Sequence, residues 1–158
     1  MTMRKLTTAL FILFISATTA KAQHENEIAA IKDHFKESNK KEIIKKFMKL
    51  EGETATTFWA IYDEYEAARQ KYAEQQSALT IKYVENFDNM TDEIAMELLT
   101  DSRNRRAAEV QLKTKYLKKI AKATTPIIAA QYAEIEHYID LVVDKEFLET
   151  LPFIGEDW

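Results

Sequence analysis

The chain has 158 residues and a formal net charge of −4 at pH 7, with no cysteine, two glycines and two prolines. An acidic chain is poorly suited to general nucleic-acid binding, and the absence of cysteine excludes disulfide frameworks and thiolate metal sites. Phosphate-binding loops, nucleophile elbows and dinucleotide-binding turns need clustered glycines, so we expect no enzyme and assign no catalytic residue and no cofactor.

Residues 1–22 have the three parts of a secretory signal peptide. A basic start is followed by an apolar run, residues 6–20, and by the small residues of a cleavage site at Ala20 and Ala22. A retained membrane anchor is the alternative, but the run is shorter than the ~20 residues that cross a bilayer. We expect a periplasmic mature protein without a membrane span. Its formal net charge changes from −4 to −7, because the segment contains Arg4, Lys5 and Lys21 and no acid.

The mature chain predicts an all-α domain, residues 23–150, followed by a tail, residues 151–158. Apolar residues recur every three or four positions, which is typical of helices with one buried face. The four predicted helices span residues 26–50, 53–85, 91–123 and 126–148. A break in the first helix near residues 38–40 remains open, because Asn39 and Glu42 have the spacing of a capping box.

The predicted helix boundaries have local signals. Gly52 leads into the second helix, and residues 86–89 have the composition of a turn. Thr91, followed by two acids, predicts the start of the third helix. Thr125 with Pro126 ends that helix and starts the fourth, since proline is favoured at the first helical position.

The second and third predicted helices carry matching stripes. Facing residues of an antiparallel hairpin have position numbers with a constant sum, and a sum of 178 places apolar residues opposite apolar ones and Arg69 opposite Glu109. The pairs are Phe58–Ile120, Tyr62–Tyr116, Arg69–Glu109, Tyr72–Arg106, Gln76–Ser102, Leu79–Leu99 and Tyr83–Ala95. We therefore predict a long antiparallel helical hairpin, flanked by an N-terminal and a C-terminal helix.

Two interpretations of Arg69, Glu109 and Arg106 are open. They could form a binding or acid–base site inside the hairpin, or they could be a structural ion pair that fixes the alignment of the helices. Buried ion pairs typically add little net stability but specify register. We favour the structural interpretation, and we interpret the nearby tyrosines as core residues. The tyrosines are Tyr62, Tyr65, Tyr72 and Tyr116.

The fourth predicted helix has a narrow apolar seam with alternating steps of four and three residues. Such a seam favours a helical partner, and we expect it to be exposed and to form a homodimer. The seam residues are Ile128, Tyr132, Ile135, Ile139 and Val142.

Three segments carry a resemblance to a known family. Residues 50–66 read Leu-Glu-Gly-Glu-Thr-Ala-Thr-Thr-Phe-Trp-Ala-Ile-Tyr-Asp-Glu-Tyr-Glu, residues 90–95 start a helix with Met-Thr-Asp-Glu and Ala95, and residues 126–136 read Pro-Ile-Ile-Ala-Ala-Gln-Tyr-Ala-Glu-Ile-Glu. Together they resemble envelope proteins related to the Spy and CpxP group over nearly the whole mature chain. The group's Leu-Thr-x-x-Gln box is replaced by Leu-Glu-Gly-Glu-Thr at residues 50–54, which indicates a distant branch.

The resemblance implies a four-helix, cradle-like homodimer in the periplasm. Its relatives act as ATP-independent chaperones, as envelope-stress modulators or, in some branches, as metal-linked sensors. These roles give the hypotheses that follow.

The distribution of lysines suggests a first role, which is the binding of unfolded proteins. They lie on helix faces away from the apolar stripes, whereas residues 134–158 carry eight acids and one lysine. Charge would attract unfolded clients and adaptable apolar patches would hold them, although any single lysine is equally compatible with a solvated face. The candidate residues are Lys41, Lys45, Lys49, Lys115, Lys118, Lys119 and Lys122.

A second role is docking to an envelope signalling protein, with Phe153 and Trp158 of the tail as candidate anchors. A third role is metal sensing through His24, His34 or His137. Ligand pairs on one helix need a spacing of three or four residues, and these histidines stand alone, so we assign no metal site.

Overall fold

Four α-helices and one short 3-10 helix make up residues 40–155, the part of the chain that this computed structural model describes. The elements are α2 (Lys40–Met48), α3 (Gly52–Glu85), η1 (Phe87–Asn89), α4 (Asp92–Ala123) and α5 (Pro126–Leu148). No strand occurs among these residues, so the predicted all-α class is confirmed here. The predicted signal peptide and the start of the first predicted helix lie outside the described residues.

Membrane spanning can be addressed for the same part of the chain. None of the helices in residues 40–155 combines the length and the apolar character that crossing a bilayer requires.

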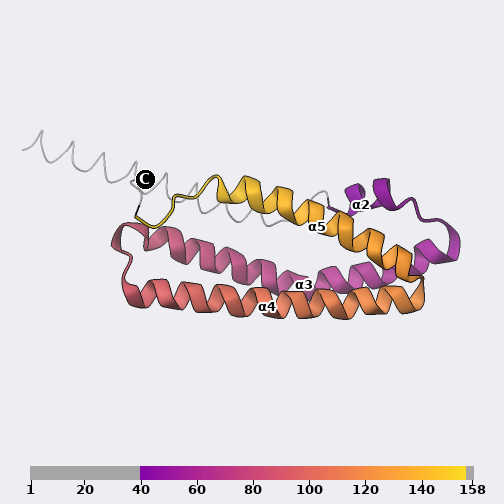
Figure 1. Ribbon diagram of the computed structural model, residues 1–158, viewed down its shortest axis with the longest axis horizontal. Helices are drawn as coiled ribbons and strands as arrows, with labels where there is room; N and C mark the ends of the chain where they lie inside the picture. Colours follow the sequence, from indigo (N-terminus) through magenta and orange to yellow (C-terminus); the bar gives the residue numbers. More distant parts are fainter. Residues whose placement is uncertain (1–39, 156–158) are drawn as a thin grey trace, which may run out of the picture. The chain divides into compact units, whose positions relative to one another are not determined.

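Helices α3 and α4, of 34 and 32 residues, run antiparallel and form the long hairpin of Figure 1. The start of α4 is fixed by Thr91, whose hydroxyl accepts a hydrogen bond from the backbone N–H of Ile94 at 3.3 Å. The start of α5 is fixed in the same way by Thr125, which accepts from Ile128 N–H at 3.2 Å, with Pro126 as the first helical residue. The helix starts predicted from these threonines are therefore confirmed.

The register of the hairpin agrees with the predicted alignment at its centre and near its turn, but Leu99, predicted to face Leu79, is 51% exposed. Arg69 meets Glu109, and Lys82 forms an ion pair with Glu97, one residue from the predicted alignment. At the open end, the ring of Tyr116 lies 5.4 Å from that of Tyr65, one turn from its predicted partner. Helical side chains lean toward the N-terminus of their own helix, so partners in an antiparallel pair are offset in this direction.

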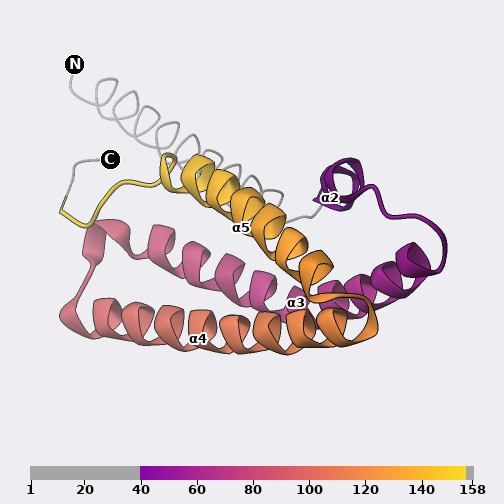
Figure 2. The same ribbon diagram turned by 45° about the vertical axis from the view of Figure 1, so that its right-hand side comes forward.

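Helix α5 folds back along the hairpin and contacts α4 and α2 (Figure 2). The seam predicted to be exposed faces inward instead. Tyr132 and Ile139 are buried, Ile128 and Ile135 pack against the core, and only Val142, 40% exposed, lies at its edge. The prediction that this seam is exposed is wrong, because the aromatic face of α3 needs cover that α4 alone does not give.

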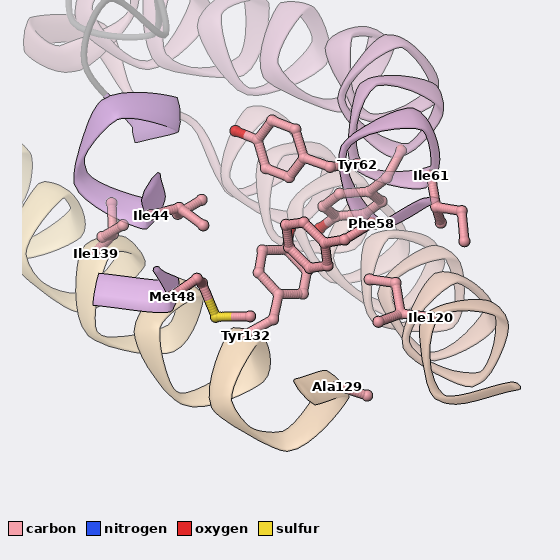
Figure 3. Close-up of a cluster of buried hydrophobic side chains, with 10 residues drawn as sticks. Ile44, Met48, Phe58, Ile61, Tyr62, Ile120, Ala129, Tyr132 and Ile139 are labelled. Carbon is pink, nitrogen blue, oxygen red and sulfur yellow. The ribbon is translucent and has the colours of Figure 1, made fainter. Parts of the chain in front are cut away.

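The core lies where α2, the first half of α3, the end of α4 and α5 come together (Figure 3). The ring of Tyr132 from α5 sits in edge contact with Phe58 at 5.4 Å and with Tyr65 at 6.4 Å between centroids. Tyr62, Tyr65 and Tyr72 are buried and Tyr116 is partly buried, as the core interpretation predicted. The buried cluster comprises Ile44, Met48, Phe58, Ile61, Tyr62, Tyr65, Ile120, Ala129, Tyr132 and Ile139.

Helix α2 packs against this core at right of Figure 2 and is joined to α3 by residues 49–51. Its C-terminus is closed by Lys49, which takes a left-handed conformation (φ 46°) and donates its N–H to Lys45 O at 3.2 Å. Gly52 also has a positive φ of 59°, which glycine adopts without a steric penalty. Two left-handed residues within four positions reverse the chain so that Ile44 and Met48 face α5 and α3.

Candidate functional site

Arg69 stands at the centre of an ion cluster between α3, α4 and α5. Its Nε lies 3.2 Å from Glu109 Oε1 of α4, the pair that the sequence predicts. Its Nη atoms lie 3.6 Å from Glu66 Oε2 and 3.7 Å from Asp140 Oδ1. One guanidinium group therefore links the three longest helices, a geometry for which its planar fork of donors is suited.

Lys113 extends the cluster along α4. Its Nζ lies 2.8 Å from Asp140 Oδ2 and 3.3 Å from Glu136 Oε2. Glu136 is 0% exposed, which makes it the most deeply buried charged side chain described. A buried carboxylate is tolerated only when cations or hydrogen-bond donors offset its desolvation, and Lys113 is the first of two cations that do so.

Lys40, the first residue of α2, is the second cation. Its Nζ lies 3.0 Å from Glu136 Oε1 and 3.0 Å from Glu66 Oε1, and the lysine is only 7% exposed. A short helix is thus fastened to α3 and α5 by a charge that water scarcely reaches.

The complete cluster has balanced charges. Arg105 adds the fourth cation, with its Nη1 at 2.6 Å from Glu109 Oε2. The four cations are Lys40, Arg69, Arg105 and Lys113, and the four acids are Glu66, Glu109, Glu136 and Asp140. Such a network fixes how the four helices align, since shifting one helix by a turn would leave buried charges without their partners.

The titration behaviour of the cluster follows from burial and charge. Burial opposes the charge of Arg69, but Glu66 and Asp140 outweigh it, so the pKa of Arg69 is raised. Burial likewise opposes the charge of Lys113, yet Glu136 and Asp140 raise its pKa above the usual value. Burial, then the charge of Glu136, raises the pKa of Tyr65 and Tyr132 far above the ordinary range. Near neutral pH these cations stay charged and both phenols stay protonated, which suits a structural cluster better than acid–base chemistry.

Arg106 requires a correction. The sequence alignment placed it beside Arg69 and Glu109, but Arg106 is exposed on the outer face of α4 and Arg105 holds Glu109 instead. Neighbouring residues on a helix differ by about 100° in direction, so an error of one position moves a side chain out of the cluster.

Sequence reasoning identified only Arg69 and Glu109 of the eight members of the cluster. The six that it missed are Lys40, Glu66, Arg105, Lys113, Glu136 and Asp140. A signal for one of them was present. Glu136 follows Tyr132 by four positions and precedes Ile139 by three, so it lies within the apolar seam of α5. A charged residue at an inward position predicts a buried partner, but the identity of that partner depends on helix packing that periodicity does not give.

The lysines predicted to bind clients come from α2, from its connection to α3 and from α4. Lys41 of α2 pairs with Asp63 and lies over the rings of Trp59 and Tyr62, at 5.5 and 5.6 Å. Lys119 of α4 pairs with Glu64, the next residue of α3. These two lysines therefore contribute to packing between helices, although each remains partly exposed.

The other predicted lysines differ in their surroundings. Lys45 pairs with Glu42 at 2.8 Å and lies over the ring of Trp59, and Lys115 lies over the ring of Tyr116. Lys49, Lys118 and Lys122 are exposed. Lys115 and Lys118 also line a shallow, open depression on α4 with Val110, Gln111 and Thr114.

The C-terminal tail returns to the tip of the hairpin. The hydroxyl of Tyr83, near the end of α3, donates a hydrogen bond to Pro152 O at 2.6 Å. Beyond this contact, Phe153 and Ile154 are 75% and 60% exposed. Trp158, the second predicted anchor, lies outside the described residues.

Histidine placement bears on the metal hypothesis. His137 is exposed on α5, and His24 and His34 lie outside the described residues. Residues 40–155 contain no group of three or more histidine or carboxylate side chains arranged to hold a metal ion.

Comparisons with protein-family models, with curated proteins and with solved structures give no match to this chain. The relationship to the Spy and CpxP group therefore stays a prediction that depends on the three segments quoted above.

Proposed function

We propose that this chain is a non-enzymatic periplasmic protein of the envelope stress response, which binds unfolded proteins without ATP as a chaperone does. The proposal includes the distant relationship to the Spy and CpxP group and a cradle-like homodimer. Its physical support is the exposed surface of the helices.

The observation that carries the proposal is an exposed face of α4 that combines an apolar side chain with lysines. Val110 is 63% exposed at this place and is bordered by Lys115 and Lys118. An unfolded segment that binds here contacts the apolar side chain of Val110 and lies close to the ammonium groups of Lys115 and Lys118. Such a surface attracts acidic or polar chains over a distance and holds apolar side chains only weakly, so a client can be released.

Further exposed apolar side chains lie on α2, α4 and α5. Phe47 of α2, Met96 and Leu99 of α4, and Tyr138, Leu141 and Leu148 of α5 are each more than half exposed. Single exposed apolar residues are ordinary on proteins, but a series of them on long helices provides the adaptable contacts that promiscuous binders use.

The test is suppression of aggregation of a heat-stressed or reduced client by the mature protein at low and high salt. We expect suppression at low salt that weakens as salt rises, because screening shortens the reach of the lysines. Val110→Ser combined with Lys115→Gln and Lys118→Gln should reduce it severalfold. The matched control is Lys145→Gln, which removes an exposed lysine from acidic α5. No suppression by the unmodified protein at stoichiometric amounts would remove the proposal.

A second candidate function is a regulatory module that docks onto an envelope signalling protein. The exposed Phe153 and Ile154 favour it, because the bond between Tyr83 and Pro152 presents them at one defined place on the hairpin tip. Deletion of residues 153–158 should abolish recovery of the signalling protein from envelope extract and leave aggregation suppression unchanged. The opposite result would favour client binding alone.

A further inference from the structure

Helix α2 covers an apolar surface built by α3 and α5, which we call its groove. Ile44, 0% exposed, and Met48, 7% exposed, enter the core beside Tyr132 and Ile139 of α5 and Phe58 of α3 (Figure 3). They are four residues apart and so project from one face of the helix. The floor of the groove is therefore fitted to two apolar side chains on successive turns.

The same groove carries the charges that select its occupant. Glu66 and Glu136 both accept from Lys40, one turn before Ile44, and Asp63 pairs with Lys41. Trp59 supplies a ring face below Lys41 and Lys45. The surface under α2 is thus matched to a helix with a lysine followed by apolar residues four and eight positions later, as Lys40, Ile44 and Met48 are.

Two features of α2 lower the free energy needed to undock it from α3 and α5. The helix has nine residues, and helices shorter than about 12 residues are marginal in water without tertiary contacts. Its connection to α3 passes through Lys49, whose left-handed φ of 46° is disfavoured for a residue with a side chain. Undocking relieves this conformation and hydrates Lys40, although it exposes the aromatic floor.

We propose that α2 is an exchangeable occupant of this groove, and that the second ligand is an amphipathic helical segment of a client with the pattern lysine, apolar at +4, apolar at +8. The inference rests on the proposed function, for which it names a class of client segment and a means of regulation. Docked α2 keeps the aromatic groove closed, and a competing segment takes its place.

The probe is a labelled peptide of residues 40–50 with blocked ends, and binding to the full mature chain is followed by fluorescence anisotropy. Lys40→Gln in the chain weakens its own α2, so the open fraction rises and the peptide binds at least about tenfold more tightly. In the Lys40→Gln chain only the peptide's lysine can use Glu136 and Glu66, so Glu136→Gln or Glu66→Gln added to that chain weakens the peptide without weakening the docked α2 further. Each of these double variants should bind the peptide more weakly than the Lys40→Gln chain.

The matched control is the same peptide with glutamine in place of its first lysine, which should bind the Lys40→Gln chain severalfold more weakly than the lysine peptide because it lacks the contacts with Glu136 and Glu66. Circular dichroism checks that each variant keeps its helix content, and the Glu66→Gln variant preserves the test should the Glu136→Gln variant unfold. No peptide binding to the Lys40→Gln chain, or equal affinities of that chain for the two peptides, would overturn the inference. If peptide binding behaves as expected but aggregation is not suppressed, the proposed function fails and the groove stands.

Discussion

Arg69 is the residue on which the alignment of three helices depends. It contacts Glu66 on its own helix, Glu109 on α4 and Asp140 on α5. A methionine at this position keeps the aliphatic volume but removes the charge that these three acids share. The result is uncompensated negative charge in a partly buried place, which is costly even where the intact pair adds little.

We expect Arg69→Met to lower the free energy of unfolding by about 3 kcal/mol, the lower end of the range for a broken buried pair because the cluster is partly hydrated. Urea denaturation followed by circular dichroism measures the change. Arg106→Met is the control, since that side chain is exposed and its loss should cost no more than about 0.5 kcal/mol. Equal losses for both arginines would contradict the assignment of Arg69 as the central cation.

The buried tyrosines predict an alkaline limit to stability. The pKa of Tyr132 is raised in the folded protein by burial and by Glu136, so the unfolded chain loses this proton first as pH rises. Its contribution is complete below the unfolded pKa of about 10 and decreases above it, by up to about 1.4 kcal/mol per pH unit. Tyr65 and Lys113, whose pKa values are also raised, act in the same direction.

Tyr132→Phe should therefore reduce the loss of unfolding free energy between pH 10 and pH 11, measured by urea denaturation at each pH. Tyr138→Phe provides the comparison, because Tyr138 lies on the exposed face of the same helix. A slope that changes equally in the two variants would argue that burial of Tyr132 does not cause the alkaline instability.

At the scale of elements, the helix starts depend on single hydroxyl groups. Thr125→Ala removes the acceptor for Ile128 N–H at the start of α5, and we expect a loss of about 1 kcal/mol of unfolding free energy. Thermal denaturation checks this value. Thr114→Ala is the internal control, since Thr114 lies within α4, bonds back to Val110 O, and gains helix propensity on replacement by alanine. A loss in the Thr114 variant as large as that in the Thr125 variant would contradict the capping role.

The hairpin was predictable from sequence because it depends on signals between residues close in the chain and on the pairing of two helices that follow each other. Threonine caps, turn residues and apolar periodicity gave the helix bounds, and two opposite charges gave the alignment. The error at Arg106 has a simple origin. Steps of three and four can alternate in either order, and the inward face of α4 passes from Ser102 to Arg105 to Glu109, not through Arg106.

The position of α2 was not predictable in the same way. Its periodicity shows that one face is apolar, but not which helix that face meets. The bond between Lys40 and Glu136 joins residues 96 positions apart, and no pattern along the chain relates them. The prediction for α5 failed for the same reason. Its apolar residues were identified correctly, but they pack against other helices of the same chain and not against a second molecule.

At the scale of the described unit, burial is unevenly distributed. The core cluster draws on residues 44–65 and 120–139, which meet at the end of the hairpin far from η1. Toward η1 the hairpin keeps Tyr72, Thr80 and Val84 buried on α3, whereas Ile120 at the other end is the buried residue of α4. The strength of packing therefore declines along the hairpin from its open end to its tip.

Local opening follows burial, so amide exchange should show this gradient. Hydrogen–deuterium exchange with mass spectrometry should find the slowest exchange in residues 54–66 and 128–140, and faster exchange in residues 75–106 after correction for intrinsic rates. Tyr83→Phe removes the donor to Pro152 O and should accelerate exchange near residues 80–95 without affecting residues 54–66. Uniform protection along α3 and α4 would instead mean that the tip is covered by contacts beyond those described, for example by a second copy of the chain.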